Sequence, residues 1–467
     1  MAGQFNLRLR TAGLQGTGNS LGSGIASGGS GKRITRKAMG MHIGNLAPTT
    51  VWGEISANAN NTYNQVPIPD IGIGSMRLWD SNGCSWRNIE KSPGVYSWGR
   101  LDNAVNLCRE KGLDIILNLG HGPDFRTTQQ GQTFYQHGIN NLWVGYNPFP
   151  PASDQIWIDW CTAIATRYAG LGVYYEIWNE VNDQSYGNDP GIAGSGYMGS
   201  VASLVNLTML AKQTIKAIDP TAKILSPNFV GEEGIQSPKV DAVTLDGFLA
   251  AGGAQHCDII SIHGYNTLPI WTRTEGMIAM SKLVRDTLAK YNVTKPMWNT
   301  EWGWGRWRDQ DDVFRVYPGN QMPDDIATQY VTRMCILSWV GGFERFYFYS
   351  IDGVQSYASI VMINPTSYQA ARTLLPAAYA FKYFSDAMNN GYLSDLQEVT
   401  GPGNMLYYKV SFTQVNGRKG FIYWCDNYTT IPLPLTGAKS CTDNLGNVVD
   451  ISSGTVNITG NPKFVYY

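Results

Sequence analysis

The sequence has few charged residues. They make up 15% of the 467 positions, against a typical share of about 25%, and the formal net charge is only -1. Nucleic-acid-binding proteins and disordered acidic tails have a different balance, because both depend on an excess of one sign. The composition therefore predicts a globular chain without a nucleic-acid partner.

Long apolar runs are absent as well. No stretch approaches the roughly 20 residues of a membrane-spanning helix, and the N-terminus lacks the continuous apolar core of a secretory signal. We expect no membrane partner. The expected location is extracellular or virion-associated, reached after removal of a signal, by another export route or by cell lysis.

Cysteine motifs are missing too. The seven cysteines are scattered and none has CxxC spacing, so the sequence indicates neither a zinc site nor a dense disulfide framework. We expect most of them to be buried thiols. Only Cys425 and Cys441, close together near the C-terminus, form a plausible disulfide pair.

Aromatic residues, in contrast, are abundant. They reach 12% of the chain, with 15 Trp and 26 Tyr. Aromatic rings beside few charges suit a surface that stacks on neutral sugar rings, and a large aromatic core is the alternative. The tryptophans expected in loops near a site are Trp79, Trp143, Trp271, Trp302, Trp304 and Trp307.

A repeating order of short apolar strand, loop and amphipathic helix begins at Ala38. Strand candidates lie at residues 39–44, 74–79, 114–119, 174–178, 223–226, 258–263, 296–300 and 344–350. Helical periodicity marks residues 101–111, 153–168, 201–218, 276–291, 324–340 and 376–388. This order predicts an α/β fold, a (β/α)8 TIM barrel over residues 38–390. A flavodoxin-like open sheet is the alternative, but residues 39–44 lack its Gly-rich phosphate loop.

The regions on either side of the barrel differ from it. Residues 1–37 are rich in Gly and Ser and predict a flexible lead-in, in which Phe5–Arg10 alternates like a strand that can join the C-terminal domain. Residues 391–467 contain short alternating runs at 406–412, 420–424, 455–459 and 464–467. These runs predict a small accessory antiparallel β-sandwich.

Two predicted barrel strands end in glutamate. Trp178-Asn179-Glu180 closes one of them and Asn299-Thr300-Glu301 the other, and the C-terminal strand ends form the active face of such a barrel. Retaining glycoside hydrolysis needs two carboxyl groups about 5 to 5.5 Å apart. We predict Glu180 as acid/base, because Asn179 can donate its amide to a neighbouring sugar hydroxyl, and Glu301 as nucleophile.

Further side chains are expected at the same mouth. Arg77 or Tyr265 is predicted to hold the charge of Glu301, although Arg77 also suits a substrate carboxylate or a buried ion pair. His121 and His263 suit sugar hydroxyls or satisfied buried imidazoles. The residues predicted to contact substrate are Asn179, Arg77, His121, His263, Tyr265, Trp302, Trp304 and His42.

Neither a metal nor another cofactor is expected. His42, His121 and His263 lack the His-x-His or HExxH spacing of common metal sites. Glu176 points to the same side of its strand as Glu180 but lies about 13 Å deeper. It is expected to be a buried, paired support.

Three stretches resemble the clan of (β/α)8 retaining glycosidases. They are Trp178-Asn179-Glu180 with Asn182, Thr300-Glu301-Trp302-Gly303, and the run from Gly94 to Asp102. Within this clan the sequence is most similar to glycoside hydrolase family 39, which includes β-xylosidases, α-L-iduronidase and an exopolysaccharide-degrading endoglycosidase. The resemblance covers about residues 38–390. It implies double displacement with Glu180 as acid/base and Glu301 as nucleophile, without metal or cofactor. Val181 stands where the clan usually has Pro.

The leading prediction is a retaining glycosidase that cuts β-linkages within a polysaccharide. The alternative with the same chemistry is an exo-acting β-xylosidase-like enzyme. The alternative from another class is a non-catalytic carbohydrate-binding or virion attachment protein. The loops at 120–151, 183–199 and 302–323 contain no pattern that identifies the sugar, and the sequence indicates no oligomeric state.

Overall fold

The computed structural model describes residues 32–44, 46, 68–79, 83–130, 147–182, 196–237, 242–265, 274–303, 306–308, 314–316, 322–351, 362, 374–394, 396–426 and 428–467. The predicted strand Phe5–Arg10 lies outside these ranges, as do Trp143, Trp271 and Trp304.

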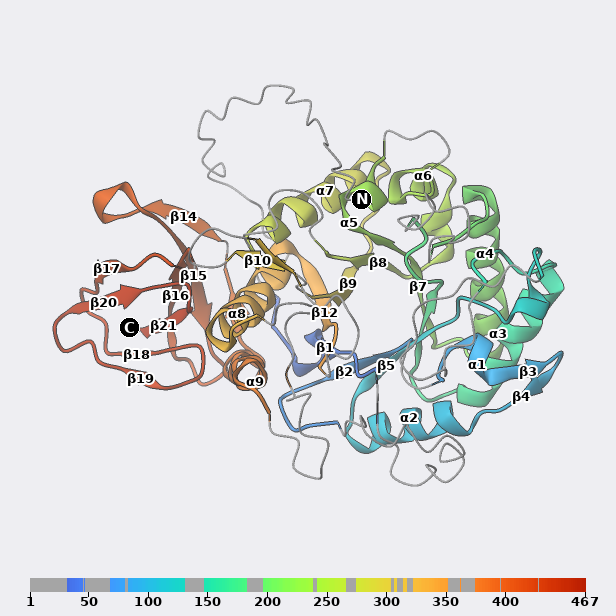
Figure 1. The fold of residues 1–467 in the computed structure, drawn as a ribbon, viewed down its shortest axis with the longest axis horizontal. Helices are drawn as coiled ribbons and strands as arrows, with labels where there is room; N and C mark the ends of the chain where they lie inside the picture. Colours follow the sequence, from blue (N-terminus) through green and yellow to red (C-terminus); the bar gives the residue numbers. More distant parts are fainter. Residues whose placement is uncertain are drawn as a thin grey trace, which may run out of the picture.

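Eight parallel strands close into a barrel at the centre of the molecule (Figure 1). Round the barrel their order is β1-β12-β9-β8-β7-β6-β5-β2, with β1 paired to both β12 and β2. The strands are β1 (Met39–Met41), β2 (Ser75–Leu78), β5 (Asp114–Asn118), β6 (Tyr174–Ile177), β7 (Lys223–Val230), β8 (Ile259–His263), β9 (Met297–Trp302) and β12 (Phe343–Phe348). The predicted (β/α)8 barrel is confirmed.

A packed layer of side chains fills part of the barrel interior. Five buried residues form a cluster separate from the main core, and each comes from a different barrel strand. They are Ile116, Leu225, Ile259, Trp298 and Tyr347. Residues on five strands of a closed barrel contact one another only across its inside. Large apolar side chains therefore fill this part of the barrel interior.

Strand β7 is longer than the sequence predicted. The expected end at Ser226 was wrong, because the strand continues through Pro227 to Val230. Proline has no N–H for the ladder and normally ends a central strand. Here the β6–β7 register shifts between Glu176 and Ile177, opposite Pro227, so the pairing resumes beyond it.

The main helices surround the barrel. On the first of them the buried residues Leu101, Ala104, Val105 and Cys108 recur at three- and four-residue spacing, which is the apolar stripe of a surface helix. The helices are α2 (Gly99–Glu110), α3 (Asp154–Tyr168), α4 (Val201–Ile218), α7 (Gly276–Lys290), α8 (Asp324–Gly341) and α9 (Pro376–Met388). The six predicted helical segments are confirmed.

Shorter elements lie in the connections. Two of them are antiparallel hairpins, β3 (Glu90–Ser92) with β4 (Val95–Tyr96) and β10 (Arg306–Arg308) with β11 (Phe314–Val316). The others are η1 (Arg36–Ala38), α1 (Trp86–Ile89), η3 (Asp124–Arg126), α5 (Gly231–Ile235), α6 (Leu245–Ala250), η5 (Gly253–His256) and, in the C-terminal region, η7 (Pro402–Asn404).

The C-terminal region is a separate β domain, drawn in orange and red in Figure 1. A seven-stranded sheet has the order β13-β15-β16-β21-β18-β19 with β14 on β15, and β17 pairs with β20 in a second sheet. Their bounds are β13 (Tyr392–Leu393), β14 (Gln397–Thr400), β15 (Leu406–Thr413), β16 (Lys419–Cys425), β17 (Ile431–Pro434), β18 (Ser440–Thr442), β19 (Val448–Val449), β20 (Thr455–Ile458) and β21 (Lys463–Tyr466). The predicted C-terminal antiparallel β domain is confirmed.

Helix α8 lies between the barrel and the C-terminal domain (Figure 1), and every residue from Ile326 to Gly341 is buried. Arg333 extends from this helix into the domain. Its Nε donates to the carbonyl of Gly460 at 2.9 Å and its Nη2 to the carbonyl of Cys425 at 2.6 Å. One buried guanidinium therefore joins the barrel to two segments of the domain.

All seven cysteines are buried free thiols. The expectation of buried thiols is confirmed, and the plausible Cys425–Cys441 disulfide was wrong. Cys425 ends β16 and Cys441 lies in β18, and β21 separates these strands in the sheet. Burial raises the pKa of Cys425 to about 12 and that of Cys441 to about 11. Over the described ranges, no helix has the length and apolarity to cross a bilayer.

Candidate active site

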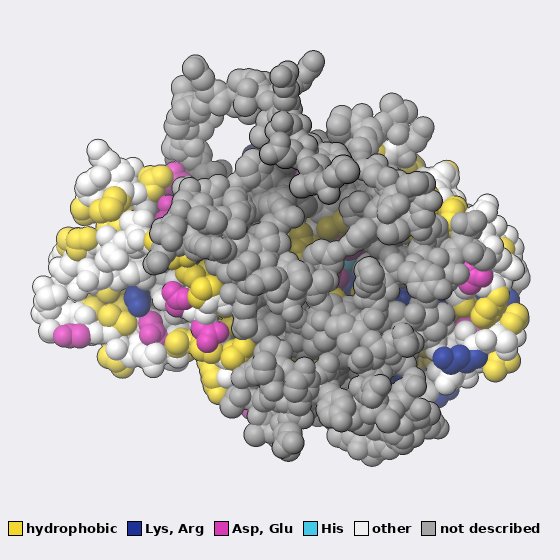
Figure 2. Space-filling model, viewed as in Figure 1, with side chains coloured by type: hydrophobic (Ala, Val, Ile, Leu, Met, Phe, Trp, Pro, Cys, Tyr) yellow, Lys and Arg dark blue, Asp and Glu magenta, His cyan; other side chains and the backbone are white. Residues whose placement is uncertain are grey.

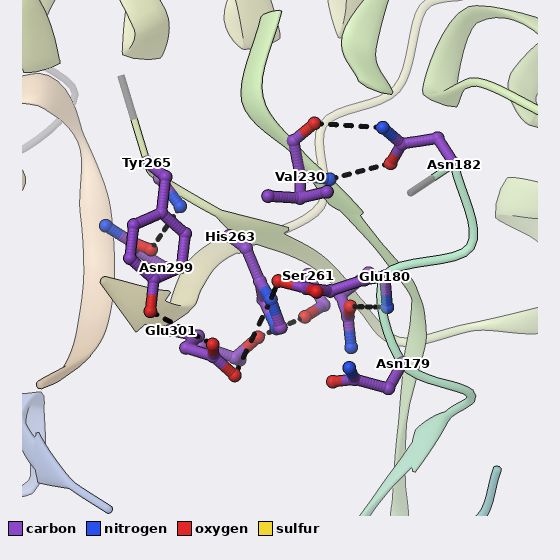
Figure 3. A network of polar contacts seen from close by, with 12 residues as sticks. Asn179, Glu180, Asn182, Val230, Ser261, His263, Tyr265, Asn299 and Glu301 are labelled. Carbon is purple, nitrogen blue, oxygen red and sulfur yellow. Dashed lines mark hydrogen bonds and ion pairs between the residues drawn. The ribbon is translucent and has the colours of Figure 1, made fainter. Parts of the chain in front are cut away.

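Two glutamates and a histidine meet at the C-terminal ends of three barrel strands (Figure 3). Glu180 follows β6, His263 ends β8 and Glu301 lies in β9. Figure 2 shows acidic and histidine side chains near the middle of the face on which these ends lie. Parallel strands bring residues from distant parts of the chain to one rim, as the sequence predicted.

The two carboxylates are close together. One side-chain atom each from Glu180, His263 and Glu301 lie within 4.8 Å of one another. Carboxyl groups in retaining glycosidases are about 5 to 5.5 Å apart, whereas inverting enzymes leave about 6.5 to 9.5 Å for a water molecule. The short separation therefore fits direct attack by a carboxylate.

Arg77 of β2 holds three partners with its three nitrogens. Nε donates to Glu176 at 2.6 Å, Nη1 to Glu301 at 2.9 Å and Nη2 to the Oδ1 of Asn179 at 2.7 Å. The arginine is fully buried. Of the alternatives left open by the sequence, these contacts favour support of Glu301 within a buried ion-pair network over binding of a substrate carboxylate.

The contact with Arg77 also orients Asn179. Because the amide oxygen of Asn179 accepts from the guanidinium, its NH2 group is left to donate elsewhere. Asn179 is 5% exposed, at the rim next to Glu180. A donor fixed in this way can bind a hydroxyl beside the reacting carbon of a sugar.

Glu176 lies deeper in the barrel and is fully satisfied. Besides Arg77, it accepts from the Nδ2 of Asn118 at 2.9 Å and from the hydroxyl of Ser261 at 2.6 Å. With this many donors, the acceptor sites of the buried carboxylate are filled. Its position is that of the predicted support.

Glu301 receives a donor on each oxygen. The hydroxyl of Tyr265 donates to Oε1 at 3.0 Å, and Arg77 donates to Oε2. Burial raises the pKa of Tyr265 well above its ordinary value, and the charges of Glu301 and Glu180 add to this. Tyr265 is therefore a neutral donor throughout the physiological range, and both predicted supports of Glu301 contact it.

His263 contacts both glutamates. Its Nδ1 lies 2.9 Å from Oε1 of Glu180 and 3.6 Å from Oε2 of Glu301. Burial, followed by the charges of Arg77 and His42, holds the pKa of His263 well below its ordinary value, so the imidazole is neutral. Its Nε2 has no hydrogen-bond partner among the described residues. A buried unpaired N–H is rarer than an unpaired acceptor, so we assign the proton to Nδ1, which donates to Glu180.

The backbone around Asn179 has an uncommon conformation. Trp178 and Glu180 both have positive φ, at 61° and 44°, a region that costs roughly 1 to 2 kcal/mol for a residue with a side chain. Asn228 of β7 holds this segment, since its Oδ1 accepts from the N–H of Glu180 and its Nδ2 donates to the carbonyl of Trp178 at 3.0 Å. Asn118 donates to the same carbonyl.

Sequence comparison decides the family. The profile of the cellulase family, glycosyl hydrolase family 5, matches residues 40–329, which is more than half of the chain. The chain belongs to this family. Comparison with curated protein sequences gives no match.

Solved structures of glycoside hydrolases from families 39 and 30 have the same fold as this family 5 chain. A family 39 glycoside hydrolase from Bacteroides cellulosilyticus has a TM-score of 0.57 at 16% identity, with 93% of this chain and 82% of that chain covered. For a family 39 β-xylosidase from Caulobacter crescentus the TM-score is 0.58 at 15% identity, with 95% and 98% covered. A family 30 xylanase from Talaromyces cellulolyticus gives 0.53 at 16%, with 94% and 98% covered. The predicted clan of retaining glycosidases is confirmed, and the protein is a glycoside hydrolase with a carbohydrate substrate.

Three residues of this family 5 enzyme that were predicted to contact substrate are buried more deeply than the two glutamates. His42 is buried, with its Nε2 2.9 Å from the carbonyl oxygen of Thr300, and His121 is buried with its ring centroid 5.1 Å from that of Trp178. The ring of Trp302 is fully buried and packs edge-to-face on Phe348. These three rings belong to the barrel wall, and their contacts with a sugar stay predictions.

A metal ion is the other ligand that the cluster could hold, because Glu180, His263 and Glu301 offer three donor atoms within 4.8 Å. Both oxygens of Glu301 already accept from Arg77 and Tyr265. The buried charge of Arg77 also opposes a second cation nearby. The donor set therefore fits paired carboxylate chemistry better than metal binding.

Two residues of the site were not predicted. Asn118 and Asn228 lie inside barrel strands and hold the chain around Asn179. The available signal was a polar amide in an otherwise apolar strand at the level of the catalytic rim.

Proposed function

We propose that this protein is a retaining, endo-acting glycosidase that cleaves β-linkages of a polysaccharide, with Glu301 as nucleophile and Glu180 as acid/base. The observation that carries the proposal is the pair of carboxylates, in which one oxygen of Glu180 lies within 4.8 Å of one oxygen of Glu301. In the first step Glu301 attacks the anomeric carbon while Glu180 protonates the leaving oxygen. In the second, Glu180 takes a proton from the water that releases Glu301.

The contacts of the two glutamates support different roles for them. Arg77 and Tyr265 donate to Glu301, which favours the ionised form that a nucleophile needs. Neutral His263 donates to Glu180, and it adds no positive charge that would oppose protonation there. Glu180 is also the more exposed of the two, with 17% of its side chain accessible against 9% for Glu301, so it is better placed to exchange protons with water.

The substrates to test first are β-linked glucans and xylans. The family is named for cellulases, and proteins of similar fold include a xylanase and a β-xylosidase. An exo-acting β-xylosidase-like enzyme is the second candidate. Product analysis separates the two, because mixed oligosaccharides in the first minutes support endo action and monosaccharide alone supports exo action.

Replacement of Glu301 by Gln tests the nucleophile. The amide has nearly the same shape but cannot form the glycosyl ester, so we expect turnover to fall by at least about 10³-fold with the fold retained. Glu233→Gln, at an exposed carboxylate of α5, is the matched control and should keep full activity. Near-normal turnover by Glu301→Gln, or labelling of another residue by a 2-deoxy-2-fluoro glycoside, would reassign the nucleophile.

Replacement of Glu180 by Gln tests the acid/base role. An aryl glycoside with an acidic phenol needs no proton for departure, so the first step should stay fast and the glycosyl enzyme should accumulate as a burst. Hydrolysis of a polysaccharide, whose leaving group needs the proton, should fall by about 10² to 10⁴-fold. Equal losses on both substrates would contradict this role.

A further inference from the structure

Trp79 lies just beyond the end of β2, on the side of the chain that faces the catalytic mouth. Arg77 of the same strand points into the barrel, because it contacts Glu301 and Asn179. Successive side chains of an extended chain alternate between two faces, so Leu78 lies on the other face and Trp79 on that of Arg77. At about 3.3 Å per residue, Trp79 is about 6.6 Å nearer the rim than Arg77.

Ring contacts connect Trp79 to the segment that carries the acid/base. Its ring centroid is 4.8 Å from that of His121, which is 5.1 Å from that of Trp178. The three residues follow the ends of β2, β5 and β6, which are neighbours in the barrel, and Trp178 directly precedes Asn179. His121 and Trp178 are fully buried, whereas Trp79 is partly exposed. Of these three rings, Trp79 is therefore the one with surface left for a ligand.

The neighbours of Trp79 fix the position of its ring. The buried guanidinium of Arg87 has its carbon 5.7 Å from the indole centroid, a distance at which a cation is attracted to an aromatic ring. The ring of His121 is tilted by 41° from the indole plane, so the two rings do not stack face to face. A side chain that is already held in place loses little conformational freedom when it binds a ligand.

Trp79 also offers a hydrogen-bond donor. Its indole N–H bonds none of the described residues, and it is not enclosed in the way that the unpaired Nε1 of Trp302 is. Because Trp79 is partly exposed, this donor faces open space at the mouth. An indole joins an apolar ring to one polar N–H, and a sugar joins apolar C–H faces to a rim of hydroxyl acceptors. The two groups are therefore complementary.

We propose that Trp79 packs on the glycone, the neutral sugar that Glu301 and Asn179 hold during the reaction, an inference that rests on the proposed function. Glu180 protonates the leaving oxygen, and it contacts His263 of β8. In the ring of eight strands β2 lies directly opposite β8, so Trp79 is on the side of the sugar that stays rather than the sugar that leaves. Its ring supplies apolar contact and its N–H supplies direction.

Calorimetric titration of the full-length Glu301→Gln protein tests the contact without turnover, with cellotriose and xylotriose as probes. Addition of Trp79→Ala to this background should weaken binding of the better ligand by at least about 10-fold, because an aromatic contact and a donor are both lost. Equal affinity in the two proteins, or binding of neither trisaccharide, overturns the proposal. Normal turnover by Glu301→Gln would refute the proposed nucleophile and leave this comparison of affinities intact, so the two failures are distinguishable.

Kinetics with an aryl β-disaccharide locate the contact, because all the sugar of this substrate lies on the glycone side. In the otherwise wild-type enzyme, Trp79→Ala should raise KM about 10-fold with a smaller change in kcat, since the ring contacts the sugar before and during the reaction. An unchanged KM for the aryl substrate, together with weaker trisaccharide binding, would place Trp79 on the leaving-group side and overturn the assignment.

Two further variants separate direct contact from support of neighbouring residues. Trp79→Phe keeps an aromatic face, so it should restore most of the binding lost in Trp79→Ala, and an equal loss would contradict ring packing. Sugar on the indole also alters its emission, so the fluorescence change on ligand binding should be smaller in Trp79→Phe than in its parent. Equal changes would mean that Trp79 acts only through its neighbours. Tyr379→Ala, at a ring of α9 that is 50% exposed, should bind like its parent.

Discussion

His263 lies between two carboxylates without a charge of its own. Burial and the nearby charges of Arg77 and His42 lower its pKa, and the contact with Glu180 is a hydrogen bond from a neutral ring. Such a ring can position the acid/base without adding a cation to the site. The folded state is therefore less stable at low pH, because the unfolded histidine binds a proton that the folded one does not.

This difference predicts how stability depends on pH. The contribution of His263 is complete above the unfolded pKa of about 6.5 and is lost as pH falls toward the lower folded value, by up to about 1.4 kcal/mol per pH unit. His263→Gln removes the titrating group, so its free energy of unfolding should vary less steeply between about pH 6.5 and 4.5. Urea unfolding at a series of pH values measures both slopes. Parallel curves for wild type and variant would contradict the neutral assignment.

At the scale of elements, the tip of β6 depends on its neighbour β7. Asn228 forms two bonds to the segment that carries Asn179 and Glu180. Asn182, just beyond, exchanges a further pair of bonds with the backbone of Val230 at 2.8 and 3.0 Å. These bonds hold two residues at positive φ, and the position of Glu180 follows from them.

Asn228→Ala should therefore lower catalysis by displacing Glu180. The N–H of Glu180 loses its acceptor, which destabilises the fold by about 1 to 3 kcal/mol. Displacement of the acid/base by a fraction of an ångström should lower kcat by about 10 to 100-fold with a smaller change in KM. Steady-state kinetics and thermal unfolding measure the two effects. Asn206→Ala, at a surface amide that bonds Asp154, should change neither, and a purely structural role for Asn228 would leave kcat per folded molecule unchanged.

These elements also show what the sequence could and could not predict. The strands and the roles proposed for Glu180 and Glu301 follow from local patterns, an apolar run that ends in an acid. Asn228 was missed because its partners lie at the end of another strand. Pro227 also made the strand appear to end at Ser226, whereas the pairing resumes after a register shift. Burial of a ring is equally non-local: Trp302 follows Glu301 directly, yet it packs on Phe348 of the next strand.

At the scale of the whole molecule, α8 packs against both the barrel and the C-terminal domain. A surface helix of a barrel usually exposes one face, but α8 is buried on all sides because the C-terminal domain covers the outer one. Tyr383 of α9 adds a hydroxyl contact to Thr442 of that domain. The domain is therefore held by packing and buried polar bonds as well as by its covalent link.

Removal of the Arg333 guanidinium should weaken this connection. Arg333→Met leaves the carbonyls of Gly460 and Cys425 without these donors, which should destabilise the protein by about 2 to 5 kcal/mol. We expect the C-terminal domain to unfold first, as a separate calorimetric transition. A protease should also cleave the chain near residue 391 faster than in the wild type. Lys382→Met, in an exposed pair with Asp386, should have little effect. A single unshifted transition in Arg333→Met would show that packing alone holds the domain.

The buried thiols leave the surface free for selective labelling. Maleimide and spin-label reagents react with accessible thiolates, and all seven native cysteines are covered. Cysteines introduced at Val95 and Val415, which are 56% and 69% exposed, would be the fast-reacting positions without any native cysteine being removed. Labels there, one on the barrel and one on the C-terminal domain, would form a molecular ruler for the distance between them while the enzyme works.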